Sequence, residues 1–264
     1  MSKSDIEIND FTIIVNSCDK YRQTWEPFFK LFKKNWSSCK YNIVLNTETE
    51  TLQESYGLNI TTINSPSKYS WSKRLLNVLR KIDSTYVLFL LDDEFLLSQV
   101  SVHDFETALS YLRDNKDVGY ILLRHSEKQK VLMEERFFER SKITEKYLIV
   151  LLSSLWRKDY LMKLLRSHES PWDFERFANR RALRMKYKIM QYSNSFPVIF
   201  DYDDRSIGLQ RGKWLPDTKS MLESNNIYID YDVLGWSDWK LGQQTIAPKV
   251  SFVKDLIKRI RSFF

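Results

Sequence analysis

Through the first half of the chain, short apolar runs alternate with segments whose apolar residues recur at helical spacing. Apolar runs this short are typical of buried strands, and the longer segments are typical of helices packed on a sheet. The sequence therefore predicts the order β-α-β-α-β-α-β and an α/β fold with a doubly wound, mostly parallel sheet. The predicted strands cover 11–15, 43–45, 86–91 and 119–123, and the predicted helices cover 21–36, 71–82 and 103–113.

The second half of the chain is less regular. Residues 201–239 are rich in Gly, Pro, Asp and Asn and are expected to be mostly loops. A chain of 264 residues without an evident linker fits one domain, which we place at 1–246, followed by a tail over 247–264. The predicted elements of this half are a strand over 147–152, a helix over 158–166, a helix from 172 to 188 and a strand over 197–200.

Polar residues gather directly after three of the predicted strands, at 16–19, 46–48 and 92–94. Right-handed crossovers place the C-terminal ends of parallel strands along one edge of the sheet. Ligands of such sheets bind beyond that edge. The three clusters therefore predict a binding site there.

The last of these clusters consists of three adjacent carboxylates, Asp92, Asp93 and Glu94. Carboxylates placed together after a buried strand are costly unless cations or hydrogen-bond donors compensate them. Hard oxygen ligands suit Mg²⁺ or Mn²⁺, which also bind diphosphate oxygens. We therefore predict a metal site formed by Asp92, Asp93 and Glu94. The alternative is a solvated acidic turn that caps the next helix.

Three segments resemble the GT-A-fold glycosyltransferases, in particular the family-2-like transferases of bacterial surface-polysaccharide synthesis (capsule or O-antigen type). They are FTIIVNSCDKY, YSWSKRLLNVLRKIDSTYVLFLLDDEFLL and SSLWRKDYLMKLLRSHESPWDFE, in matching order over much of 11–176. The resemblance implies a donor-binding half over about 1–125 and a loop-rich acceptor-side half over about 126–246. The triplet takes the place of the family's D-x-D element, but with Glu at its third position.

The resemblance also implies residues for the donor, a nucleoside-diphosphate sugar, with a UDP-sugar favoured. The first-strand loop would hold the base and ribose, and Asp92 and the start of the helix over 71–82 would lie near the diphosphate. A helix N-terminus with a nearby Arg suits a phosphate. Ser17 or Asp19 could instead cap the following helix. The predicted donor-binding residues are Asn16, Ser17, Asp19, Tyr21, Ser72, Arg74 and Asp92.

A second acidic segment, over 169–175, supplies candidates for the catalytic base of an inverting displacement, as the resemblance implies. Ser170 and Pro171 are typical of a helix start, and the helix dipole favours ionised acids in the first turn. An ionised carboxylate facing a cleft can remove a proton from an acceptor hydroxyl. We favour Glu175, with Asp173 and Glu169 as alternatives, and expect Trp172 to stack on the acceptor sugar. Ordinary helix capping by these acids is the competing interpretation.

Arg211 and Lys213 flank Gly212 in the loop-rich half. Gly permits a close approach of the backbone, and the two cations suit a diphosphate. We predict a loop that closes on the leaving nucleotide. A surface turn is the simpler alternative.

The tail from 251 onward, SFVKDLIKRIRSFF, predicts a basic amphipathic helix with one apolar face. Such a helix suits the surface of an anionic membrane, although its apolar face could instead dock on the domain or on a second subunit. Two cysteines without metal spacing indicate a reducing cytoplasm. We therefore expect a cytoplasmic protein held peripherally at the inner face of the cell membrane, where a lipid-linked, possibly undecaprenyl-linked, glycan acceptor would be presented.

The leading hypothesis is a glycosyltransferase that uses Mn²⁺ or Mg²⁺. A nucleotidyltransferase that acts on sugar phosphates is an alternative, but the glycine-rich phosphate loop it needs is missing from 16–21. The net charge of +7 allows a nucleic-acid-binding protein. The cations are scattered among acids, however, and no nucleic-acid motif stands out, so we expect no nucleic acid partner.

Overall fold

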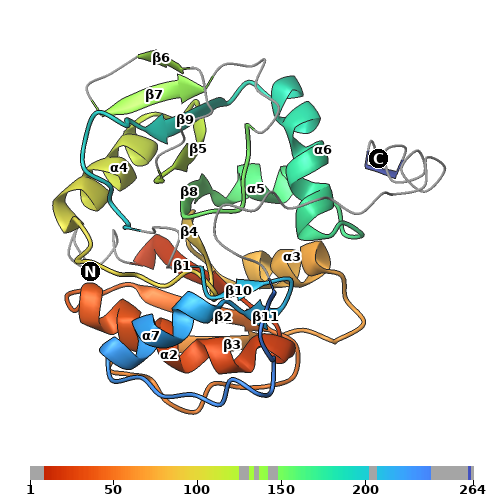
Figure 1. Cartoon of the computed structure of the whole chain (residues 1–264). Helices are drawn as coiled ribbons and strands as arrows, with labels where there is room; N and C mark the ends of the chain where they lie inside the picture. The colour runs from red at the N-terminus through yellow and green to blue at the C-terminus, as the bar shows by residue number, and fades with distance from the viewer. Residues whose placement is uncertain are drawn as a thin grey trace.

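The computed structural model describes residues 9–124, 131–133, 137–141, 148–201, 207–238 and 261–262. Within these ranges, nine strands form one sheet in the order β3-β2-β1-β4-β8-β5-β9-β7-β6 (Figure 1). The strands are β1 (Phe11–Asn16), β2 (Asn42–Thr47), β3 (Ile60–Asn64), β4 (Tyr86–Leu91), β5 (Val118–Leu122), β6 (Val131–Met133), β7 (Phe138–Ser141), β8 (Ser154–Arg157) and β9 (Lys188–Tyr192).

The sheet is mixed, with most strands running in one direction. Strands β3, β2, β1 and β4 are parallel neighbours, and β5 and β9 are a second parallel pair. Strand β8 lies between these two groups and is antiparallel to β4 and β5, while β7 is antiparallel to β9 and β6. The prediction of an α/β fold with a mostly parallel sheet is confirmed, and β8 is the departure from a purely parallel centre.

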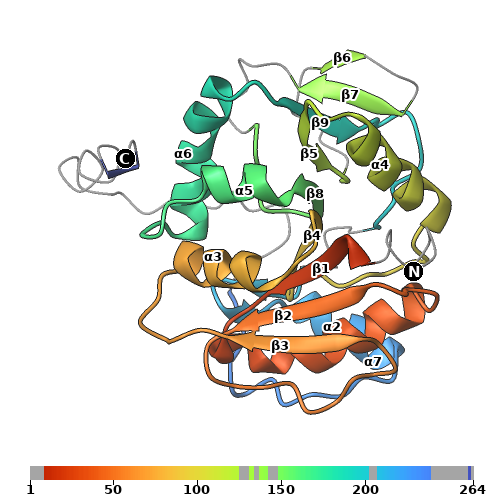
Figure 2. The same ribbon diagram turned by 180° about the vertical axis from the view of Figure 1, so that it is seen from behind.

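Helices cover both faces of the sheet (Figures 1 and 2). Side chains alternate between the faces of a strand, so Ile13 and Val15 pack with α2, α4 and α7, whereas Ile14 packs with α3, α5 and α6. The helices are η1 (Asp19–Tyr21), α2 (Arg22–Asn35), α3 (Trp71–Lys81), α4 (Val102–Asp114), α5 (Lys158–Leu164), α6 (Pro171–Arg184) and α7 (Pro216–Ser224).

The strand predicted over 147–152 is wrong for the described residues 148–152, which do not form one. The backbone N–H of Ile149 donates to Asn179 Oδ1 at 3.1 Å, and that of Leu151 donates to Glu175 Oε1 at 2.6 Å. These N–H groups bond to side chains of α6 rather than to a strand. Pairing resumes only at Ser154, in β8.

The strand predicted over 197–200 is also wrong, because this segment is a loop. Ile199 and Phe200 are fully buried in the cluster beneath α2 and α4. Their apolar character therefore comes from core packing without strand pairing. The strand of this region is β9, and the helix predicted up to 188 ends at Arg184.

Most of the tail lies outside the described residues, so the predicted amphipathic helix over 251–264 is described only at Arg261 and Ser262. Ser262 O accepts a hydrogen bond from Arg181 Nη1 at 3.0 Å, which places this part of the tail beside α6. None of the described helices combines the length and the apolar character needed to cross a bilayer.

Candidate active site

The predicted binding edge is formed by the loops that follow β1, β2 and β4 (Figure 1). In the register of the sheet, Asn16 lies beside Asn46 on one side and beside Leu91 on the other. Asn46 Nδ2 donates to Asn16 Oδ1 at 2.8 Å, and Ser17 N donates to Asn46 O at 2.9 Å. The three polar clusters therefore meet at one edge, as parallel topology requires.

Asp19 organises the loop after β2. Its carboxylate accepts hydrogen bonds from Thr47 Oγ1 at 2.7 Å, from Thr49 Oγ1 at 2.5 Å and from the backbone N–H groups of residues 48–50. Burial alone would raise the pKa of Asp19, but the hydrogen bonds from Thr49 and Thr47 lower it below its usual value. Asp19 is therefore held as a carboxylate at the tip of the edge.

Arg74 of α3 reaches the same loops. Its guanidinium pairs with Glu48, whose other carboxylate oxygen accepts from Asp19 N at 2.6 Å. Ser72, in the first turn of the same helix, is fully buried, and its N–H donates to Glu169 O. Of the two predicted residues on this helix, Arg74 lies at the edge, and Ser72 joins α3 to the loop before α6.

Asp92 is tied to the loop after β1. Its Oδ2 accepts from Ser17 Oγ at 2.5 Å and from Thr24 Oγ1 at 2.7 Å, and Trp25 Nε1 donates to Ser17 Oγ at 2.6 Å. Burial and the neighbouring charge of Asp93 raise the pKa of Asp92. The carboxyl of Asp92 therefore fixes the first-strand loop against α2.

Glu94 lies in a buried cluster with two charged residues from other elements. Its Oε1 is 3.2 Å from Arg124 Nη1, and its Oε2 is buried without a partner among the described residues. Burial raises the pKa of Glu94 to about 7, Arg124 opposes this shift, and the charges of Asp93 and Glu175 add to it. The strand-end triplet and the second acidic segment, predicted separately, are thus electrostatic neighbours.

The sequence interpretation missed Arg124. It follows directly after the strand predicted over 119–123, where the rule that selected the other polar residues would have found it. The positive charge of Arg124 offsets the negative charge of Glu94. This lowers the free-energy cost of burying Glu94 near a second carboxylate.

The predicted metal site is not assembled as a set of three carboxylates. Asp92 accepts hydrogen bonds from two hydroxyls, Glu94 pairs with Arg124, and only Asp93 remains half-buried without such a partner in the described structure. Across the described residues, no group of three His, Cys, Asp or Glu side chains could hold a metal ion. The donor set therefore does not fit a three-carboxylate Mn²⁺ or Mg²⁺ centre.

The three candidates for the base have different surroundings. Glu169 is buried and receives two hydrogen bonds from Arg181, at 2.8 and 2.7 Å. Asp173 forms a capping box with Ser170 at the start of α6. Glu175 has one oxygen bonded to Leu151 N, and burial raises its pKa.

Trp172 is 78% exposed in the first turn of α6, two residues before the buried Phe174. It is the most exposed of the large apolar side chains in the described part of the chain. Its ring is therefore available to a ligand on the outer side of this helix.

A hairpin over 209–214 closes over the first-strand loop. Its strands are β10 (Leu209–Gln210) and β11 (Lys213–Trp214), and its tip is formed by Arg211 and Gly212, both with positive φ, 54° and 77°. A Cβ on Gly212 would lie 3.0 Å from Lys20 Nζ and from Tyr21 Oη. Gly208 N donates to Asp93 O at 2.7 Å at the base of the hairpin. The predicted residues Arg211 and Lys213 therefore lie in a turn that spans from the triplet to Tyr21.

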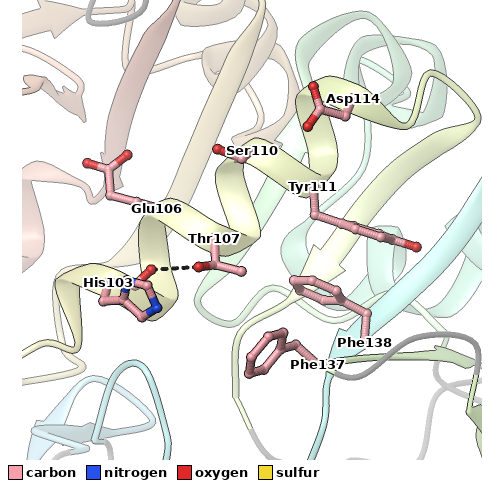
Figure 3. A pocket seen from close by; sticks show the side chains of 8 residues that line it. All are labelled: His103, Glu106, Thr107, Ser110, Tyr111, Asp114, Phe137 and Phe138. Atoms are coloured by element: carbon pink, nitrogen blue, oxygen red, sulfur yellow. Dashed lines mark hydrogen bonds between the residues drawn. The ribbon is translucent and has the colours of Figure 1, made fainter.

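Two cavities of the described structure lie away from this edge. The larger is an open groove of about 520 Å³ between α4 and β7, lined by side chains such as His103, Ser110 and Phe137 (Figure 3). The smaller, of about 360 Å³, lies between the end of α6 and the start of β9. The predicted site residues line neither cavity, so the site rests on the arrangement of its side chains.

No protein-family model matches the chain, and no curated protein matches it. Among solved structures, the chain is similar to the mannosyltransferase PcManGT from Pyrobaculum calidifontis in complex with GDP-Man and Mn²⁺. The identity is 12% and the TM-score 0.50, over 77% of this chain and 58% of that one. It also matches residues 1–349 of S. aureus TarS in complex with UDP at 12% identity and TM-score 0.48, over 72% and 59%. A cytidylyltransferase from Leptospira borgpetersenii matches at 12% identity and TM-score 0.46, over 90% and 99%.

The likeness to the mannosyltransferase is one of fold. It confirms the GT-A-like α/β architecture expected from the sequence, in a chain with no match at the level of family models. The chain spans about three-fifths of the length of the TarS and mannosyltransferase chains that it matches.

Proposed function

We propose that the chain is a glycosyltransferase that moves a monosaccharide from a nucleoside-diphosphate sugar to a glycan acceptor. The observation that carries the proposal is the meeting, at one sheet edge, of the first-strand loop, Arg74 and the strand-end acids, and the charge of Glu175 is near enough to raise the pKa of Glu94. Ligands of open α/β sheets bind at such an edge. The mannosyltransferase of similar fold, solved with GDP-Man, supports a nucleotide-sugar donor.

In this proposal the nucleoside lies over Asn16, Asp19 and Tyr21, and its diphosphate extends toward the triplet. Asp19 shapes the loop under the nucleoside, because its carboxylate accepts hydrogen bonds from Thr47, Thr49 and the backbone N–H groups of residues 48–50. Arg74 keeps Glu48 in place beneath the same loop. These groups position the donor and do not take part in bond making.

Glu175 is proposed as the general base. Leu151 N holds one carboxylate oxygen, which leaves the other for an acceptor hydroxyl. The base takes the hydroxyl proton while the acceptor oxygen bonds to the anomeric carbon and the nucleoside diphosphate leaves with the electron pair of the broken C–O bond. A single displacement of this kind inverts the anomeric centre.

The buried Oε2 of Glu94 would accept a hydrogen bond from a sugar hydroxyl, since it lacks a partner among the described residues. Trp172 would stack on the acceptor sugar, because an exposed ring offers an apolar face to a pyranose. The proposal extends to a lipid-linked acceptor at a membrane, which rests on the basic and apolar sequence of 251–264.

The products distinguish this proposal from a nucleotidyltransferase. We expect ³¹P NMR of the protein with a panel of nucleotide sugars, an acceptor glycan mixture and Mg²⁺ to show a nucleoside diphosphate accumulating from one donor. Release of inorganic pyrophosphate from a nucleoside triphosphate and a sugar 1-phosphate, with no nucleoside diphosphate from any sugar nucleotide, would contradict the proposal. The Glu175→Gln variant serves as the control for contaminating activity.

A further inference from the structure

We infer that the β10–β11 hairpin and Lys20 bind the donor diphosphate directly, as a clamp of cations, so that donor binding does not require a divalent metal ion. This inference rests on the proposed function and concerns the same site. It starts from the hydrogen bonds and the ion pair that the strand-end carboxylates already form, because the sequence had predicted these carboxylates to be metal ligands.

One oxygen of Asp92 and one oxygen of Glu94 are already engaged by other groups of the protein. Asp92 Oδ2 already accepts two hydrogen bonds, from hydroxyls that position the first-strand loop and α2. Glu94 Oε1 lies 3.2 Å from the Arg124 guanidinium, whose charge would repel a nearby divalent cation. Fewer carboxylate oxygens are therefore free for a metal ion than the sequence suggests, and cations of the chain are an alternative source of positive charge for a diphosphate at this edge.

The hairpin supplies that charge. Lys20, Arg211 and Lys213 are all exposed, and they come from the two segments that meet at Gly212. The tip packs closely on Lys20 and Tyr21, since a Cβ on Gly212 would lie 3.0 Å from both side chains, and the φ of 77° favours glycine at this position. Arg211 and Lys213 flank Gly212, so the hairpin brings two cationic residues to backbone positions next to Lys20.

The backbone of the tip supports a binding role. Arg211 has a φ of 54°, a region that costs an L-residue about 1 kcal/mol or more. Such residues persist where the surroundings hold them, and they occur often at ligand clamps. At the base of the hairpin, Gly208 N donates a hydrogen bond to Asp93 O of the triplet. This bond fixes the position of the hairpin relative to the acids.

Isothermal titration of the full chain with UDP, GDP, CDP and ADP tests the inference, each in EDTA and in Mn²⁺. We expect one nucleotide to bind in EDTA with a dissociation constant within about threefold of that in Mn²⁺. Removing a charge-assisted contact costs about a factor of ten in affinity, so Lys20→Ala and Lys213→Ala should each weaken binding about tenfold. Lys30→Ala removes an exposed lysine of α2, paired with Glu26, and should leave binding unchanged.

The outcomes separate the inference from the function on which it rests. Binding that occurs in Mn²⁺ and is lost in EDTA would overturn the clamp and leave the proposed function standing. Binding in EDTA that neither lysine variant weakens would also overturn the clamp. If no nucleotide binds under either condition, both the clamp and the proposed function are wrong.

Discussion

The Glu175→Gln variant is expected to lose sugar transfer by at least about 100-fold while it still binds the donor nucleotide, because positioned general bases contribute about 10²–10⁴-fold. Glutamine keeps the oxygen that accepts from Leu151 N, so the link between α6 and the 148–152 segment is preserved. The loss should therefore appear in kcat rather than in the unfolding transition. Initial rates with a saturating donor measure it.

The pH dependence of the transfer rate of the wild-type protein follows from the carboxyl group of Glu175. Burial raises the pKa of Glu175, and a general base works only when deprotonated. The rate should therefore rise with pH, with a midpoint above the usual range of a glutamate. A transfer rate that stays constant as the pH falls to the usual pKa range of a glutamate would contradict the assignment of Glu175 as the base.

Asp173→Asn is the matched control, because it changes a carboxyl in the same turn of α6. Asp173 belongs to the capping box with Ser170, so its loss should cost about 1 kcal/mol of stability and leave the rate within a few-fold. A larger rate loss for this variant than for Glu175→Gln would make Asp173 the base.

The second large effect is on stability. Arg181→Met leaves the carboxylate of Glu169 buried without its two hydrogen bonds, and breaking a buried pair by removing one partner typically costs about 3–5 kcal/mol. Arg181 also donates to Ser262 O, so the variant also removes this contact with the tail. Urea unfolding measures the loss as a lower midpoint.

Two further variants show whether the burial of the ion pair causes the loss of stability. The double change Glu169→Leu with Arg181→Met should recover most of the stability, since an apolar pair leaves no buried charge. Lys163→Ala breaks the exposed pair with Asp159 and should cost less than about 1 kcal/mol. An equally small loss for Arg181→Met would mean that the pair is solvated.

The fold was predictable where a strand is buried on both faces and lies between helices. Strands β1, β2, β4 and β5 are short apolar runs of this kind, so their length and apolar character identify them. Strand β3 lies at the edge of the sheet and is partly exposed, so its apolar signal is weak. In the runs predicted as strands over 147–152 and 197–200, the buried side chains are Leu148, Ile149, Leu151, Ile199 and Phe200, and apolar character alone does not say whether a backbone pairs.

The site was predictable as a location but not as a set of contacts. The carboxyl ends of parallel strands identify Asp19 and Asp92, yet spacing does not reveal that Asp92 would bond Thr24 across 68 residues. Likewise, the acids of 169–175 look alike in sequence, and their differences come from partners such as Arg181 that lie on other turns or elements. Tertiary contacts decide which carboxylate is structural.

The central claim is that a nucleotide diphosphate lies on the edge formed after β1, β2 and β4. Hydrogen–deuterium exchange with and without the nucleotide that binds most tightly tests it most directly. The account predicts slower exchange at 17–21, 47–50 and 93–94 and at the hairpin over 209–214. Protection confined to the α4 groove near His103 and Ser110, or no protection at this edge, would contradict it.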